Sequence, residues 1–173
     1  RGTILNTQLI NDGYDFLILG TYFERADFSA RIINVKYFIL LPSINYVGSE
    51  IDNFQWSLML RSISSFRAFK WAYGGQEITY TKIIDFLILN MTCPRSLIFS
   101  IEKINHHLGR LNKSYKQNSI SKKKVGLMYK NLKNLNANRI SDTGLHEFLK
   151  SFIEEINFVY KKFEQKYFFG VET

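Results

Sequence analysis

Hydrophobic and polar positions predict one long N-terminal helix, which runs from about Asn6 to Leu41. Apolar residues recur there at helical spacing over several turns. Pro42 and Ser43 end the pattern, because a proline disfavours the helical conformation of the residue before it. At 1.5 Å per residue the helix would be about 54 Å long, which suits the central element of a helical bundle.

The rest of the chain predicts shorter helices separated by turn residues. Apolar spacing and capping residues place them at about 53–73, 79–89, 94–111, 125–135 and 141–163, with a mobile polar loop at 113–124. Only two prolines, Pro42 and Pro94, occur in 173 residues, which suits long helices better than a turn-rich β fold. We therefore expect an all-α fold in one domain, residues 1–173: a bundle of about six helices with one long central N-terminal helix.

Three charged residues, Glu24, Asp27 and Arg31, fall on one stripe of the first helix. The same stripe carries apolar residues and two glycines: Leu9, Ile10, Gly13, Leu17, Gly20, Phe28, Val35 and Phe38. We therefore expect the charges to face the core, where an unpaired charge costs on the order of several kcal/mol and each needs a partner. The interpretation we favour is a structural network, and the alternative is an acid/base or ligand site.

The histidines give little support for a metal site. His106 and His107 are adjacent, so on a helix they point about 100° apart and cannot bind one ion together from that surface. His146 with Glu147 lies near a helix N-terminus, where such a pair is typical of a cap and surface feature. The usual metalloprotease, phosphate-loop and hydrolase motifs are missing, so we expect no metal and no cofactor.

A basic segment extends from Lys103 to Arg139 and contains no Asp or Glu. Such a segment attracts anions, and Lys122, Lys123 and Lys124 are its candidate anion-binding residues. Its aromatic residues are sparse and it has no nucleic-acid-binding motif. A solvated basic face is therefore favoured over contact with nucleic acid.

Composition bears on where the chain is found. Glu24, Arg25 and Asp27 interrupt the longest apolar run, so we expect no membrane-spanning segment. Cys93 is the only cysteine, which excludes an internal disulfide and suits a reducing compartment, so a cytoplasmic location is expected. Because the chain begins at Arg1 rather than Met, we also expect it to be a piece of a longer protein.

Short segments along most of the chain form a set whose order and spacing are specific. They are Gly13-Tyr-Asp-Phe-Leu-Ile-Leu-Gly20, Phe23-Glu-Arg-Ala-Asp27 with Ala30-Arg31, Val35-Lys-Tyr37, Phe54-Gln-Trp56 with Leu60-Arg-Ser62, Phe86-Leu-Ile-Leu89, Pro94-Arg-Ser96-Leu97 and Gly144-Leu-His-Glu-Phe148. In this set the chain resembles the bacterial alpha-E domain family, and more specifically the C-terminal half of a full-length member. Glu24-Arg25 matches the Glu-Arg pair that is characteristic of that family.

The resemblance implies an all-helical cytoplasmic protein, often encoded beside or fused to ATP-grasp proteins, transglutaminase-like proteases and related peptide-processing proteins. It also implies a missing N-terminal half with its own Glu-Arg helix. The chain departs from its relatives at Asn90-Met-Thr-Cys93, where they usually carry an acidic residue. Arg95, within a matching segment, joins His146 and Glu147 as a secondary site candidate.

Three functional hypotheses follow. We favour a non-catalytic accessory module of an ATP-grasp ligase or transglutaminase-like partner in peptide synthesis or modification. Its cluster of Glu24, Arg25, Asp27 and Arg31 would bind a small zwitterionic or peptide ligand, or shape the surface that the partner recognises.

The second hypothesis is an enzyme acting on a small amino-acid or peptide substrate, with Glu24 and Asp27 as acid and base and Arg31 holding a substrate carboxylate. A solvent-open cleft at the cluster would favour this enzyme, and a sealed cluster would favour a scaffold. The third and weakest hypothesis is anion or RNA binding through residues 103–139.

Overall fold

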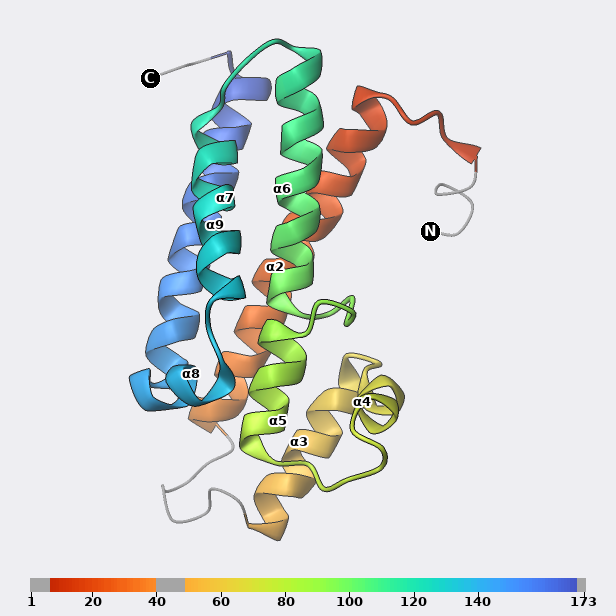
Figure 1. Ribbon diagram of the computed structural model, residues 1–173, viewed down its shortest axis with the longest axis vertical. Helices are drawn as coiled ribbons and strands as arrows, with labels where there is room; N and C mark the ends of the chain where they lie inside the picture. The colour runs from red at the N-terminus through yellow and green to blue at the C-terminus, as the bar shows by residue number, and fades with distance from the viewer. Residues whose placement is uncertain (1–6, 40–48, 171–173) are drawn as a thin grey trace.

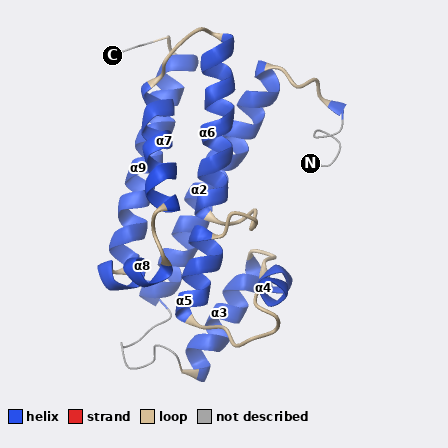
Figure 2. Ribbon diagram, viewed as in Figure 1, coloured by secondary structure: helices blue, strands red, loops and turns tan. Residues whose placement is uncertain are grey.

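The chain is helical throughout the part that the computed structural model describes, residues 7–39 and 49–170 (Figures 1 and 2). These residues form eight α-helices and one short π-helix, with no strand. The all-α prediction is confirmed. The helices exceed the expected six because one predicted helix is divided and a further short helix precedes the last one. None of the described helices has the length and apolar character needed to cross a membrane.

Four long helices form the body of the molecule. They are α2 (Asp12–Ile39), α6 (Leu97–Ser114), α7 (Ile120–Lys133) and α9 (Leu145–Tyr167). α2 packs against α6 and α9, and α7 packs against the same two helices, so the four enclose a shared apolar core. Figure 1 shows α2 running diagonally behind α6. The predicted start and end of the first helix, Asn6 and Leu41, lie outside the described residues, but residues 8–11, which were predicted to be helical, are not helical, and α2 begins at Asp12.

Shorter helices cover one end of this body (Figure 1). They are α3 (Glu50–Ser62), α4 (Phe66–Ala72), α5 (Tyr80–Ile84), the π-helix η2 (Asp85–Leu89) and α8 (Ala137–Thr143). α3 packs against α2 and α4, η2 packs against α6, and α5 packs against α8. This end of the molecule therefore consists of short elements, four of them consecutive in the sequence and joined by α8 from further along the chain.

Capping side chains set most of the helix starts. Ser49, Thr79, Ser96, Ser119 and Asn136 each accept a hydrogen bond from the backbone N–H three residues further on. The cap at Ser119 starts α7 earlier than predicted. As a result, Lys122 to Lys124 lie in a helix and not in the mobile loop that was predicted.

Two backbone breaks account for the remaining differences from the predicted helices. Ser64 has φ 57°, and it ends α3 where one continuous helix was predicted through Tyr73. Gly144 has φ 98° and separates α8 from α9. Positive φ is incompatible with a continuing α-helix, so each break turns the chain at a residue that apolar spacing does not identify.

The face of α2 that packs on the core is opposite to the predicted one. Leu19 and Ile33 are buried against α6 and α9, whereas Phe28 and Val35 are 47% and 49% exposed. From Gly13 onward, the exposed residues of α2 whose side chains are described form one stripe: Gly13, Leu17, Gly20, Glu24, Phe28, Arg31 and Val35. The prediction was wrong because both faces of α2 carry large apolar residues, so spacing alone could not select the buried one.

Candidate functional site

A groove of about 290 Å³ between α2 and α9 contains both predicted carboxylates. It opens to solvent, so the side chains along it can meet a dissolved molecule. The residues that line it are Gly20, Phe23, Glu24 and Asp27 on α2, and Ile156, Asn157 and Tyr160 on α9. The site is therefore built from two long helices of the bundle, whose packing fixes their separation.

Asp27 has two oxygens in different surroundings. Arg31 Nε donates a hydrogen bond to Asp27 Oδ2 at 2.7 Å, one helical turn away. This bond and the charge of Asp27 raise the pKa of the Arg31 guanidinium above its ordinary value. Asp27 Oδ1 is buried and accepts no hydrogen bond from any described residue. An unsatisfied buried acceptor costs about 1–3 kcal/mol, so Oδ1 is an atom that a bound donor would stabilise.

Glu24 and Arg25 are neighbours with different roles in the structure. Glu24 is exposed at the groove and has no hydrogen bond or ion pair with any described residue. Arg25 Nη1 donates to the Pro94 carbonyl oxygen at 3.2 Å, and its guanidinium carbon lies 4.8 Å from the centre of the Tyr22 ring. Arg25 therefore fastens the turn before α6 to α2, whereas Glu24 faces solvent.

The structure thus brings Glu24, Asp27 and Arg31 together along one stripe of α2, as predicted, but on its solvent side. The expectation that this stripe faces the core is wrong, because both faces of α2 carry large apolar residues and spacing alone could not select the buried one. Arg31 is 55% exposed in its side chain and does not line the groove. The cluster therefore opens to solvent at the groove.

The secondary candidates lie elsewhere. His146 Nδ1 is 2.8 Å from Asn34 Oδ1 and connects the start of α9 to α2. Glu147 is exposed, with its carboxylate close to Gly144. Arg95 is half-buried in the turn before α6. None of these three lines the groove between α2 and α9.

The three candidate lysines lie in different surroundings on α7. Lys122 Nζ donates to Asn105 Oδ1 on α6, and burial lowers the pKa of Lys122 below its ordinary value. Lys124 pairs with Glu155 on α9, with 3.2 Å between Nζ and Oε2. Only Lys123 is exposed. Two of the three charges are thus engaged within the bundle.

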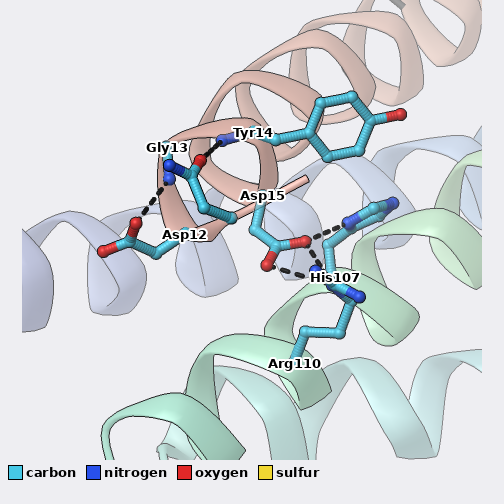
Figure 3. A network of polar contacts seen from close by, with 7 residues as sticks. Asp12, Gly13, Tyr14, Asp15, His107 and Arg110 are labelled. Atoms are coloured by element: carbon cyan, nitrogen blue, oxygen red, sulfur yellow. Dashed lines mark hydrogen bonds and ion pairs between the residues drawn. The ribbon is translucent and has the colours of Figure 1, made fainter. Parts of the chain in front are cut away.

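A buried network that the sequence analysis missed joins α2 to α6 (Figure 3). Asp15 is 1% exposed, and its carboxylate accepts from Arg110 Nε at 2.7 and 3.0 Å, while His107 Nδ1 lies 2.6 Å from Asp15 Oδ1. Burial lowers the pKa of His107, which favours a neutral ring that donates its Nδ1 proton to Asp15. The available signal was the spacing of His107 and Arg110, three residues apart beside the apolar stripe of α6.

A second missed pair joins α2 to α3. Lys36 and Asp52 are each 1% exposed and form an ion pair, and Lys36 Nζ lies 4.1 Å from the centre of the Trp56 ring. Burial lowers the pKa of Lys36, against the opposing effect of Asp52. Because the pair is sealed from solvent, we assign it to packing. Its signal in the sequence was a lysine within an apolar helix.

Within residues 7–39 and 49–170, no group of three or more His, Cys, Asp or Glu could hold a metal ion.

Comparison with known proteins identifies the family of the chain. No curated protein and no solved structure matches the chain. A family model described as Alpha-E, a predicted alpha-helical domain with a conserved ER motif, matches residues 1–168. Glu24-Arg25 is the only Glu-Arg pair in the sequence and so supplies that motif. The chain therefore belongs to the Alpha-E family.

Proposed function

We propose that this chain is a non-catalytic binding module in which the groove between α2 and α9 holds the ammonium group of an amino acid or peptide. The observation that carries the proposal is Asp27 Oδ1, which is buried and accepts from no residue that the structure describes, while Oδ2 is held by Arg31. An ammonium group has three donors and no acceptor, so it can satisfy Oδ1 and still reach the carboxylate of Glu24.

The charge of the groove supports a cationic ligand. Its lining contains the carboxylates of Glu24 and Asp27 and no lysine or arginine, although the chain as a whole has a formal net charge of +8. Attraction between opposite charges is stronger beside an apolar protein wall than in bulk water. Phe23, Ile156 and Tyr160 supply that wall. The rings of Phe23 and Tyr160 meet edge to face, with 5.5 Å between their centres. Tyr160 also offers an aromatic face to a cation.

We further propose that the module serves an ATP-grasp-type ligase or a transglutaminase-like protein in peptide synthesis or modification. The support is the resemblance of the chain to a family that is often encoded beside such proteins. The chemistry of the groove agrees with it, because peptide bond formation and transamidation both consume an amine. Co-purification of the chain with the products of neighbouring genes tests this part, and a lack of any association would contradict it.

An enzyme that acts through the same groove is the second candidate. One observation favours it: the groove opens to solvent and is not sealed. Glu24 and Asp27 would then act as base and acid. The lining residues include no serine, cysteine or histidine that could act as a nucleophile, so we place binding first.

The binding proposal is tested by native mass spectrometry of the chain purified from cells. Three forms are compared: wild type, Asp27→Asn, and Glu77→Gln as a matched control on the exposed loop between α4 and α5. Retention of an amine-bearing amino acid or peptide by wild type and the control, with loss in folded Asp27→Asn, is expected. Equal retention by all three forms would contradict the proposal, and conversion of the retained compound over time would indicate an enzyme.

A further inference from the structure

The exposed stripe of α2 is apolar except for one charge of each sign. Leu17, Phe28 and Val35 are 37%, 47% and 49% exposed, and a Cβ added at Gly20 would meet no atom within 4 Å. A helix that packs on the core with one face and keeps large apolar residues on the other is typical of a surface that another protein covers. We therefore expect a protein partner whose shape and charge match this stripe.

The order of residues along the stripe is complementary to itself when reversed. In an antiparallel pair of α2 helices with a twofold axis between residues 27 and 28, position 24 of one helix lies opposite position 31 of the other. Glu24 then faces the second copy's Arg31, and Arg31 faces the second copy's Glu24. Position 20 likewise lies opposite position 35, so Gly20 leaves room for Val35, and the two Phe28 side chains approach the axis.

We propose that a second copy of this chain docks antiparallel on the exposed stripe of α2. An isologous contact of this kind uses the same surface on both copies, and each ion pair occurs twice. A parallel arrangement would instead set Glu24 against Glu24 and Arg31 against Arg31. Opposite charges at these two positions therefore select the antiparallel form.

The charged groups are free to form these pairs. Glu24 has no hydrogen bond or ion pair with a described residue. Arg31 uses Nε to bind Asp27, and it makes no other hydrogen bond to the described residues, so its two Nη groups remain for a carboxylate. Two guanidinium Nη groups can pair with the two oxygens of one carboxylate. The contact is small, so association is expected in the micromolar range or weaker.

Sedimentation velocity of the 173-residue chain over a range of concentrations tests the inference. Glu24→Arg sets a positive charge opposite the second copy's Arg31, and Arg31→Glu sets two negative charges together. Because each contact occurs twice, either change should raise the dissociation constant by about tenfold or more. Combining Glu24→Arg with Arg31→Glu restores opposite charges and should return the constant to within about threefold of wild type. Glu77→Arg is the matched control and should change nothing.

Gly20→Trp provides an independent variant. A Cβ at this position meets no atom within 4 Å in a single copy, whereas the indole would collide with the second copy. The variant should therefore weaken association while circular dichroism remains that of the folded chain. The proposal is overturned by a wild-type chain that stays monomeric up to about 0.5 mM. The proposal is also overturned if Gly20→Trp leaves the dissociation constant unchanged, or if the double charge reversal does not restore it. The inference does not rest on the ammonium site, because it depends on Arg31, which does not line the groove proposed for the ligand.

Discussion

Arg31 Nε donates to Asp27 Oδ2 at 2.7 Å, and Oδ1 of the same carboxylate is buried without a donor among the described residues. One oxygen of Asp27 therefore fixes the side chain on α2, and the residue itself lines the groove beside α9. Glu24, one turn before Asp27, adds a second carboxylate without a partner among the described residues. This arrangement is the basis for the proposed ammonium site.

The two residues of the ER motif should differ in their effect on stability. Arg25→Gln removes the hydrogen bond to Pro94 and the contact with the Tyr22 ring, so the free energy of unfolding should fall by about 1–2 kcal/mol. Glu24→Gln removes no contact with a described residue and should change the free energy of unfolding by less than about 0.5 kcal/mol. Urea unfolding followed by circular dichroism measures both values. Equal losses would show that Glu24 also has a structural role.

The buried pair between α2 and α3 should be strongly coupled. Asp52→Asn leaves the Lys36 ammonium buried without its counter-ion, and Lys36→Met leaves the carboxylate of Asp52 in the same position. Each change should cost about 3–5 kcal/mol of unfolding free energy. The double variant should cost less than the sum of the two. A double-mutant cycle in urea measures the coupling, and additive losses would argue against a direct pair.

Stability should depend on pH through His107. Burial lowers the pKa of His107 below its ordinary value of 6.5, with smaller contributions from the charges of His106 and Arg110 and an opposing one from Asp15. The unfolded chain then binds a proton at a pH where the folded chain does not. The free energy of unfolding should therefore decrease as the pH falls below about 6.5.

Urea unfolding at several values between about pH 8 and pH 5 checks this dependence. His107→Gln should flatten the pH profile, because it removes the titrating ring. His106→Gln, at an exposed neighbouring position, is the control and should leave the profile as in wild type. A slope that survives His107→Gln would assign the effect to another group.

Two glycines should respond to alanine in opposite directions. Gly20 lies inside α2 with open space around an added Cβ, so Gly20→Ala should stabilise the chain by about 0.5–1 kcal/mol. Gly144 has φ 98°, and an added Cβ would also meet the Glu147 carboxylate. Gly144→Ala should destabilise the chain by more than about 1 kcal/mol. Thermal unfolding of both variants provides the comparison, and a shift in the same direction would contradict it.

Local features of the sequence predicted most of the helices. Thr79 caps α5 at the predicted place, and helical apolar spacing located the four long helices of the bundle. The break at Ser64 was not predicted, because nothing in a run of apolar residues marks a serine that adopts positive φ. Local patterns thus establish where helices form more reliably than where they are interrupted.

Contacts between residues on different helices could not be predicted from the sequence in the same way. Asp15 and His107 are far apart in the sequence and meet only because α2 packs against α6. Which face of α2 is buried also depends on that packing, since both faces are apolar. Helical spacing therefore predicted correctly that Glu24, Asp27 and Arg31 are neighbours, because all three lie on one helix. It predicted the wrong side of that helix for them.

The ammonium site can be tested by an NMR titration of the ¹⁵N-labelled chain with the dipeptide Ala-Ala and with its N-acetylated form. An ammonium site predicts saturable shifts of the Asp27 and Tyr160 amides with the free dipeptide and none with the acetylated one, which has no ammonium group. The response should be lost in Asp27→Asn and kept in Glu77→Gln. Equal binding of both peptides, or unchanged binding by Asp27→Asn, would contradict an ammonium site at this groove.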